Sequence, residues 1–367
     1  MRRDPGTSGD PRRIGSSRVK LMVRLLALAG VSLFVFLIVQ QGFDDLAAAL
    51  AAAGWGLGLL AAWHVVPLTL ATRGWSGLVD TGERRLPFRC LLRMRWITES
   101  INGLLPVAAV GGDPIRATLL ARRGVAGSAA GASVVVDLTV GIFAQIVFAL
   151  LGLVVLSSYL GSEDLIVPIL VGVGFSAAIL TTFYLVQRRG LFAGAAGLLR
   201  RVVGGSVWEA WMGGARAMDE AIANLYRQRA RLGVAAAWRL AGWISGTVEV
   251  WLAASLLGHP LSLPGALMLE AMGGAVRAAA FLVPGALGVQ EGSYLLLGRL
   301  LGLPAETALA ISLAKRVREL VLGVPGLLSW QLGEGWSLIG RRSPVPAAAD
   351  GDVALERAEL ENNGRKR

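Results

Sequence analysis

Charged and strongly polar side chains occur inside segments that are otherwise apolar enough to cross a lipid bilayer. A charge near the bilayer centre costs roughly 2.5–3.5 kcal/mol on insertion scales, so a charge in such a segment is a candidate for function. These residues form two groups along the chain. The first group is Glu99, Asn102, Asp113, Arg116 and Asp137, and the second is Glu270, Arg277, Gln290, Glu291, Lys315, Arg316, Arg318 and Glu319.

A mixed set of acidic and basic groups fits the binding of a polar head group, since arginine and lysine hold phosphate well. The alternative is that these residues pair with one another and stabilise broken helices. Glu291 follows Gly288 and a proline break, at the expected start of a helix. We favour a functional role for Glu291, with capping of its own helix as the alternative.

The sequence carries no pattern that supports covalent or metal catalysis. It has no Ser-His-Asp set and no pair of carboxylates at a defined spacing, and its only cysteine is Cys90. His64 and His259 are far apart and lack metal-ligand spacing, and nucleotide-binding glycine motifs are absent. We therefore predict no catalytic residues, no metal and no cofactor, and a transporter in preference to an enzyme.

His64 lies inside an apolar segment that we expect to span the membrane. A histidine in such a place either relays protons or packs as a neutral ring. The sequence leaves both readings open, and the packed ring is the more common.

The composition indicates a polytopic membrane protein. Hydrophobic residues make up 54% of the chain and charged residues 17%, with a mean hydropathy of +0.59. About a quarter of the residues are charged in a typical soluble domain. The net charge of +11 comes from 36 basic and 25 acidic residues. Basic residues mark cytoplasmic loops and meet anionic lipids, so we predict no nucleic-acid partner.

Two segments combine an apolar composition with helix-breaking residues. Pro106 is followed by Asp113 after seven residues, and Pro284 is followed by Glu291 at the same spacing. Broken helices at membrane depth are tolerated only where protein or a wet cavity surrounds them. We expect breaks at Pro106, Gly111, Gly112, Pro284, Gly285 and Gly288, with Asp113 as the N-cap and Pro114 as the first residue of a helix.

The expected fold class is all-α, with about six full spans and two re-entrant helical hairpins. The hairpins are expected over Leu91–Arg123 and over Leu263–Ala280 with Gly285–Leu301. The expected spans are Leu21–Gln41, Trp55–Ala71, Ala129–Leu156, Leu165–Val186, Gly233–Gly258 and Ala305–Leu328. A cleaved signal peptide is the alternative for the first of these spans.

The basic loops set the expected orientation. Residues 1–20, 73–95, 187–232 and 341–367 carry the arginines and lysines that mark the cytoplasmic side. Both termini are then cytoplasmic, and the two hairpins enter from opposite sides, as in an inverted repeat; chance similarity is the alternative. We expect tails over 1–20 and 336–367 that are disordered, and one transmembrane domain over 21–335 with an amphipathic cytoplasmic insert at 187–232.

Two motifs resemble the membrane region of lysylphosphatidylglycerol synthases and of their stand-alone, flippase-like relatives. One motif is Asn102-Gly-Leu-Leu-Pro106 followed by Gly111-Gly-Asp-Pro-Ile-Arg116. The other is Val283-Pro-Gly-Ala-Leu-Gly-Val-Gln-Glu291 with Lys315-Arg-Val-Arg-Glu-Leu320. The resemblance covers roughly residues 20–335. The stretch from Arg318 to Gln331 resembles the hopanoid-biosynthesis-associated branch of that family more closely.

The resemblance implies a protein of the inner membrane that translocates or handles a lipid, either a hopanoid or a phospholipid. The chain leaves no room for the soluble aminoacyl-transfer domain or for a fused glycosyltransferase, so we expect neither activity. The alternative is a membrane enzyme or an accessory subunit of hopanoid synthesis, for which segment 187–232 would dock soluble enzymes at the cytoplasmic face.

Overall fold

The computed structural model describes residues 54–80, 86–105, 111–160, 206–280 and 286–332, with single residues between these ranges. Several predictions fall outside the described residues. They concern the spans over Leu21–Gln41 and Leu165–Val186, both terminal tails, and the breaks at Pro106, Pro284 and Gly285.

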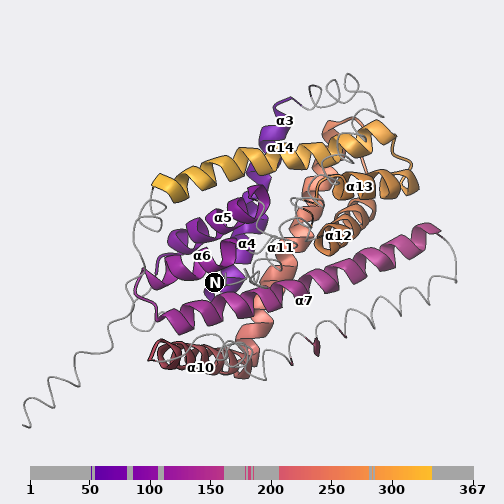
Figure 1. Cartoon of the computed structure of the whole chain (residues 1–367). Helices are drawn as coiled ribbons and strands as arrows, with labels where there is room; N and C mark the ends of the chain where they lie inside the picture. Colours follow the sequence, from indigo (N-terminus) through magenta and orange to yellow (C-terminus); the bar gives the residue numbers. More distant parts are fainter. Residues whose placement is uncertain are drawn as a thin grey trace, which may run out of the picture. The chain divides into compact units, whose positions relative to one another are not determined.

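Every long regular element in the described residues is an α-helix, which confirms the all-α prediction. The chain divides into two units, residues 1–326 and 327–367. The contacts that form the candidate site all lie in the first unit. The helices are α3 (Gly56–Trp63), α4 (Val65–Ser76), α5 (Phe88–Leu104), α6 (Gly112–Ala121), α7 (Gly127–Leu160), α10 (Ser206–Arg227), α11 (Arg229–Leu256), α12 (Leu263–Ala279), α13 (Val289–Leu300) and α14 (Ala305–Trp330) (Figure 1).

Helix α7 has 34 residues and contacts α6, α10, α11 and α12. Within the described residues, Gly127–Tyr159 is the one helical segment that is both long and apolar enough to cross a membrane. The other long helices carry more charge or are less apolar. The number of full spans therefore remains a prediction.

Helices α5 and α6 form the first hairpin, and its turn depends on two contacts. The backbone N–H of Gly112 donates to Oδ1 of Asn102 over 2.7 Å. A Cβ atom at Gly112 would lie 2.5 Å from the carbonyl oxygen of Thr98, so only glycine permits this approach. The prediction that Asp113 caps α6 is wrong: the helix starts at Gly112, so Asp113 lies in its first turn, and Asn102 accepts the N–H of Gly112.

Helices α12 and α13 form the second hairpin. Oγ of Ser262 accepts the backbone N–H of Gly265 and caps α12. Gly288 precedes α13 with a φ of 75°, a left-handed conformation that favours glycine. The carboxylate of Glu291 accepts the backbone N–H of Gly288 over 2.8 Å, so Glu291 caps α13.

The expected span over Trp55–Ala71 is interrupted at His64, which separates α3 from α4. Pro67 follows three residues later and has no N–H to donate to the carbonyl of Trp63. The missing hydrogen bond accounts for the interruption of the helix at His64. The interruption also places a titratable ring between two helices.

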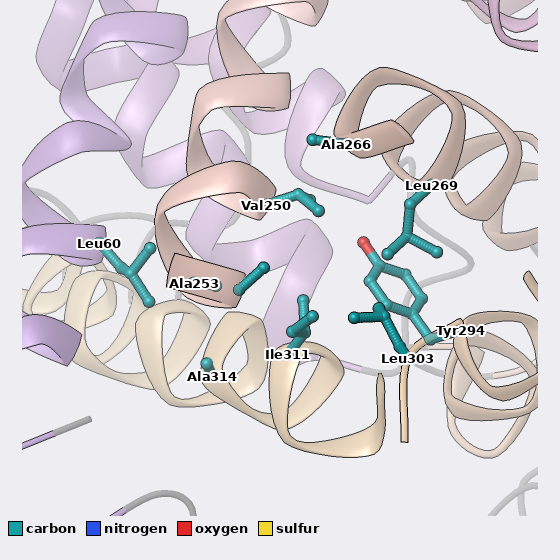
Figure 2. Close-up of a cluster of buried hydrophobic side chains, with 10 residues drawn as sticks. Leu60, Val250, Ala253, Ala266, Leu269, Tyr294, Leu303, Ile311 and Ala314 are labelled. Carbon is teal, nitrogen blue, oxygen red and sulfur yellow. The ribbon is translucent and has the colours of Figure 1, made fainter. Parts of the chain in front are cut away.

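An apolar cluster joins five helices on one side of the candidate site (Figure 2). Leu60 of α3 and Val250 of α11 are fully buried there, together with Leu269 of α12 and Ile311 of α14. The ring of Tyr294, from α13, lies in the same cluster (Figure 2). Burial of each of the larger side chains contributes about 1.5–3 kcal/mol to the stability of the folded state.

The described part of the 187–232 insert contains helix α10 and the first residues of α11, and α10 packs on α7 and contacts α11. Ile222 and Leu225 are buried in this contact. Its apolar stripe therefore covers α7, at least over this part of the helix.

Replacement of Gly112 by alanine tests the hairpin turn. We expect Gly112→Ala to lower the free energy of unfolding by about 1–3 kcal/mol, because the added methyl group meets a backbone carbonyl that cannot rotate away. Thermal unfolding in detergent measures the effect. Gly292→Ala is the control, since its Cβ meets nothing within 4 Å and alanine favours a helix. Equal stability of the two variants would contradict the contact.

Candidate functional site

The first ionic cluster surrounds Asp137, which lies on α7 and is fully buried. Its Oδ2 accepts hydrogen bonds from Arg95 of α5 over 2.6 Å and from Arg116 of α6 over 2.8 Å. Arg116 also donates to Asp113 over 2.8 Å, and its guanidinium lies 4.6 Å from the ring centre of Trp75. One carboxylate thus holds both arms of the first hairpin against α7.

The cluster extends toward a cavity through Glu99. Arg95 donates to Glu99 over 3.2 Å, one turn further along α5. The side chain of Glu99 is 38% exposed, in contrast to the other acids of this cluster. The Nδ2 group of Asn102 donates to Asp113 over 3.3 Å, so Asn102 supports both the turn and the ion pair.

The second cluster contains Glu291 and Glu319, which share Arg316. Arg316 donates to Glu291 over 3.1 Å and to Glu319 over 3.3 Å. Arg277 donates to Glu319 over 2.5 Å and to the amide oxygen of Gln290 over 3.0 Å. These contacts join α12, α13 and α14.

Glu270 is the centre of a smaller group in the same half of the chain. Lys315 donates to its Oε2, and the hydroxyl of Tyr294 donates to the same oxygen over 3.2 Å. Lys315 also approaches that hydroxyl at 3.2 Å. The tyrosine therefore places its ring in the apolar cluster and its oxygen among the charges.

The two halves of the network meet at Glu249 and His64. Arg318 donates to Oε2 of Glu249 over 3.1 Å, and Nδ1 of His64 lies 3.1 Å from the same oxygen. Arg318 also contacts the imidazole ring. On its other side, Nε2 of His64 lies 3.9 Å from a carboxylate oxygen of Glu99.

A cavity of about 530 Å³ lies among α4, α5, α7, α11, α12, α13 and α14. Its volume is typical of a pocket for a small molecule or part of a lipid. Its wall is apolar at Trp96, Leu104, Leu105, Trp243 and Leu322. The same wall carries charged residues, among them Glu99, Glu270 and Arg277, so apolar and charged side chains line one cavity.

The structure separates the predicted site residues into two sets. The wall of the cavity includes Glu99, Asn102, Glu270, Arg277, Gln290, Lys315, Arg318 and Glu319. The residues Asp113, Arg116, Asp137, Glu291 and Arg316 are not among its lining residues and hold the helices in place instead. For Glu291, the contacts are those of a helix cap and an ion pair, which supports the capping alternative.

Six polar residues of the cavity wall were not among the predicted site residues. They are His64, Ser100, Gln145, Arg239, Glu249 and Tyr294. Arg239 and Glu249 lie inside an apolar segment, so the rule applied to the other charges also identifies these two. Gln145 and Tyr294 give no comparable signal in the sequence.

Arg239 lines the cavity and forms a long ion pair with Asp137. Its Nε lies 3.8 Å from Oδ1 of Asp137, beyond hydrogen-bond range, and has no hydrogen-bond partner in the described residues. Glu249 likewise has one buried oxygen, Oε1, without a partner there. The cavity wall therefore contains a cation and a carboxylate whose hydrogen bonding within the described residues is incomplete.

The described residues contain no group of three or more histidine, cysteine or acidic side chains placed to hold a metal ion. The arrangement can bind an anionic group through arginine and lysine and a donor group through the carboxylates.

The sequence model of the lysylphosphatidylglycerol synthase TM region matches residues 23–326. The match covers most of the chain, so this protein belongs to that family, and the family resemblance seen in its motifs is confirmed. It is a membrane protein of a family associated with lipid handling. No curated protein matches the chain at a significant level.

Replacement of Asp137 tests whether the first hairpin depends on its carboxylate. We expect Asp137→Asn to destabilise the protein by about 3–5 kcal/mol, because it leaves two buried arginines without their counter-charge. Thermal unfolding in detergent checks this. Glu306→Gln is the matched control, since Glu306 is exposed in the first turn of α14. If both variants unfold at the same temperature, Asp137 does not hold the hairpin.

Proposed function

We propose that this protein is a flippase-like carrier that translocates an amphiphilic lipid between the leaflets of the inner membrane. The observation that carries the proposal is the cavity, in which charged and apolar walls face one volume. A lipid head group needs charged and hydrogen-bonding partners, whereas its tail needs apolar contacts. Membership of the family supports the connection with lipids.

The positions of the two hairpins support transport. Glu99 from the first hairpin and Arg277 from the second both line the cavity. Transporters built from inverted repeats bind substrates between such broken elements, near the middle of the bilayer. In this proposal the hairpins enter from opposite sides and both termini are cytoplasmic, as the basic loops predict.

The head group contacts the cationic part of the cavity wall. In this proposal Arg239 is the first contact, because it lines the cavity and its ion pair with Asp137 is long, 3.8 Å. Arg277, Lys315 and Arg318 follow on the facing helices. The carboxylates of Glu99 and Glu270 accept hydrogen bonds from hydroxyl or amino groups.

The proposed substrate is a hopanoid with a polar side chain or another lipid with a polar head group. The stretch from Arg318 to Gln331 supports the hopanoid branch of the family. The competing function is a membrane enzyme or accessory subunit of lipid synthesis, which would use the same cavity to hold its lipid without translocating it.

Lipid transfer in reconstituted vesicles tests the carrier function. Vesicles with the protein are expected to move a fluorescent phospholipid or hopanoid across the bilayer at least about tenfold faster than empty vesicles. Arg239→Gln should slow transfer about tenfold, the equivalent of one charge-assisted hydrogen bond worth about 1.5–3 kcal/mol. Arg299→Gln is the control, because Arg299 is exposed on α13. No acceleration with any of several lipid classes would refute transport.

Lipid extracts from a deletion strain distinguish a carrier from an enzyme. A carrier predicts that the full set of lipids is still made but is distributed incorrectly between leaflets or membranes. Mass spectrometry of total lipids, together with labelling of the outer leaflet, measures both. Loss of one lipid product from the total extract would favour the synthetic role.

A further inference from the structure

His64 is faced by ionisable groups from three other helices. They are Glu99 on α5, Glu249 on α11 and Arg318 on α14. Its side chain is 24% exposed and forms part of the cavity wall. Three further charged residues, Arg95, Lys315 and Glu319, lie next to these groups. Each forms an ion pair with another side chain.

We propose that His64 is the binding site of a proton that is carried together with an anionic lipid head group. The inference rests on the proposed carrier function and adds its coupling ion. The sequence left two readings of His64 open, a proton relay and a packed neutral ring, and the proposal takes the first.

The two contacts of Nδ1 need different hydrogen positions on the ring. Nδ1 lies 3.1 Å from Oε2 of Glu249, a contact that requires a hydrogen on the nitrogen. The same nitrogen contacts Nη1 of Arg318, which can donate only to a bare nitrogen. The two contacts cannot be hydrogen bonds at the same time, and in the proposed cycle the ring alternates between them.

In the first arrangement the ring accepts from Arg318, and Arg318 also donates to Glu249. In the second, a proton from water converts the ring to imidazolium. The imidazolium then donates from Nδ1 to Glu249 and faces Glu99 with Nε2. Two adjacent cations repel each other, so the protonated ring displaces Arg318 from the ring and from Oε2.

The displaced Arg318 has the cavity beside it, since it forms part of the cavity wall. An anionic oxygen in the cavity gives its guanidinium a new partner. Proton uptake by His64 therefore favours binding of an anionic head group. By linkage, the head group favours proton uptake by the same factor. The proton and the anion enter together without net charge, and the proton returns to water when the lipid leaves.

A histidine titration tests this linkage directly. The chain has only two histidines, and His259 lies in the loop between α11 and α12, so His259→Gln leaves His64 as the single imidazole. Ring-labelled histidine is followed by NMR in dodecyl maltoside, with and without a short-chain phosphatidic acid. We expect the lipid to raise the titration midpoint of His64 by roughly one pH unit, the shift that a tenfold coupling gives. An unchanged or lowered midpoint overturns the proposal.

Transport under a pH gradient gives a second, independent readout. For the wild type and for His259→Gln, an imposed gradient of two pH units should change the rate of phosphatidic acid transfer about fivefold or more. His64→Gln should lose this dependence on the gradient. A wild type that moves lipid equally fast with and without the gradient overturns proton coupling and leaves the carrier function intact. A wild type that moves no lipid refutes the carrier, while the NMR titration still decides whether His64 and the phosphate are linked.

Discussion

Buried charge is the constraint on which the rest of this structure depends. A carboxylate or guanidinium in a low-dielectric interior is tolerated only when an opposite charge and hydrogen bonds satisfy it. Asp137 is paired with arginines from two different helices, and Glu249 with Arg318 and His64, in both cases through one carboxylate oxygen. Because the partners come from distant parts of the sequence, satisfying the charges also fixes which helices lie together.

The cavity follows from the same constraint. The charges away from the cavity, such as Asp113 and Glu291, bond within the protein and hold the two hairpins. Other charged residues, among them Glu99 and Arg277, line the cavity. In the proposed carrier, a lipid head group would contact these residues, and the apolar wall would accept the start of its tail. One network of charges would then serve both stability and substrate binding.

The helical fold and the charged character of the site could be predicted from the sequence because both are local properties. A charge in an apolar segment is visible without a structure, as at Glu270 and Lys315. The N-cap predicted at Asp113 was wrong. The side chain that accepts an N–H at the start of α6 is that of Asn102, on the preceding helix. The position of His64 among Glu99, Glu249 and Arg318 depends on packing across the chain, which no local pattern encodes.

The charged run of α14 has a mechanical consequence. Successive residues of a helix point about 100° apart, so Lys315, Arg316, Arg318 and Glu319 reach partners on α11, α12 and α13. A rotation of α14 about its own axis would break all four pairings at once. Even a small rotation of the helix is therefore opposed by partners on three other helices together.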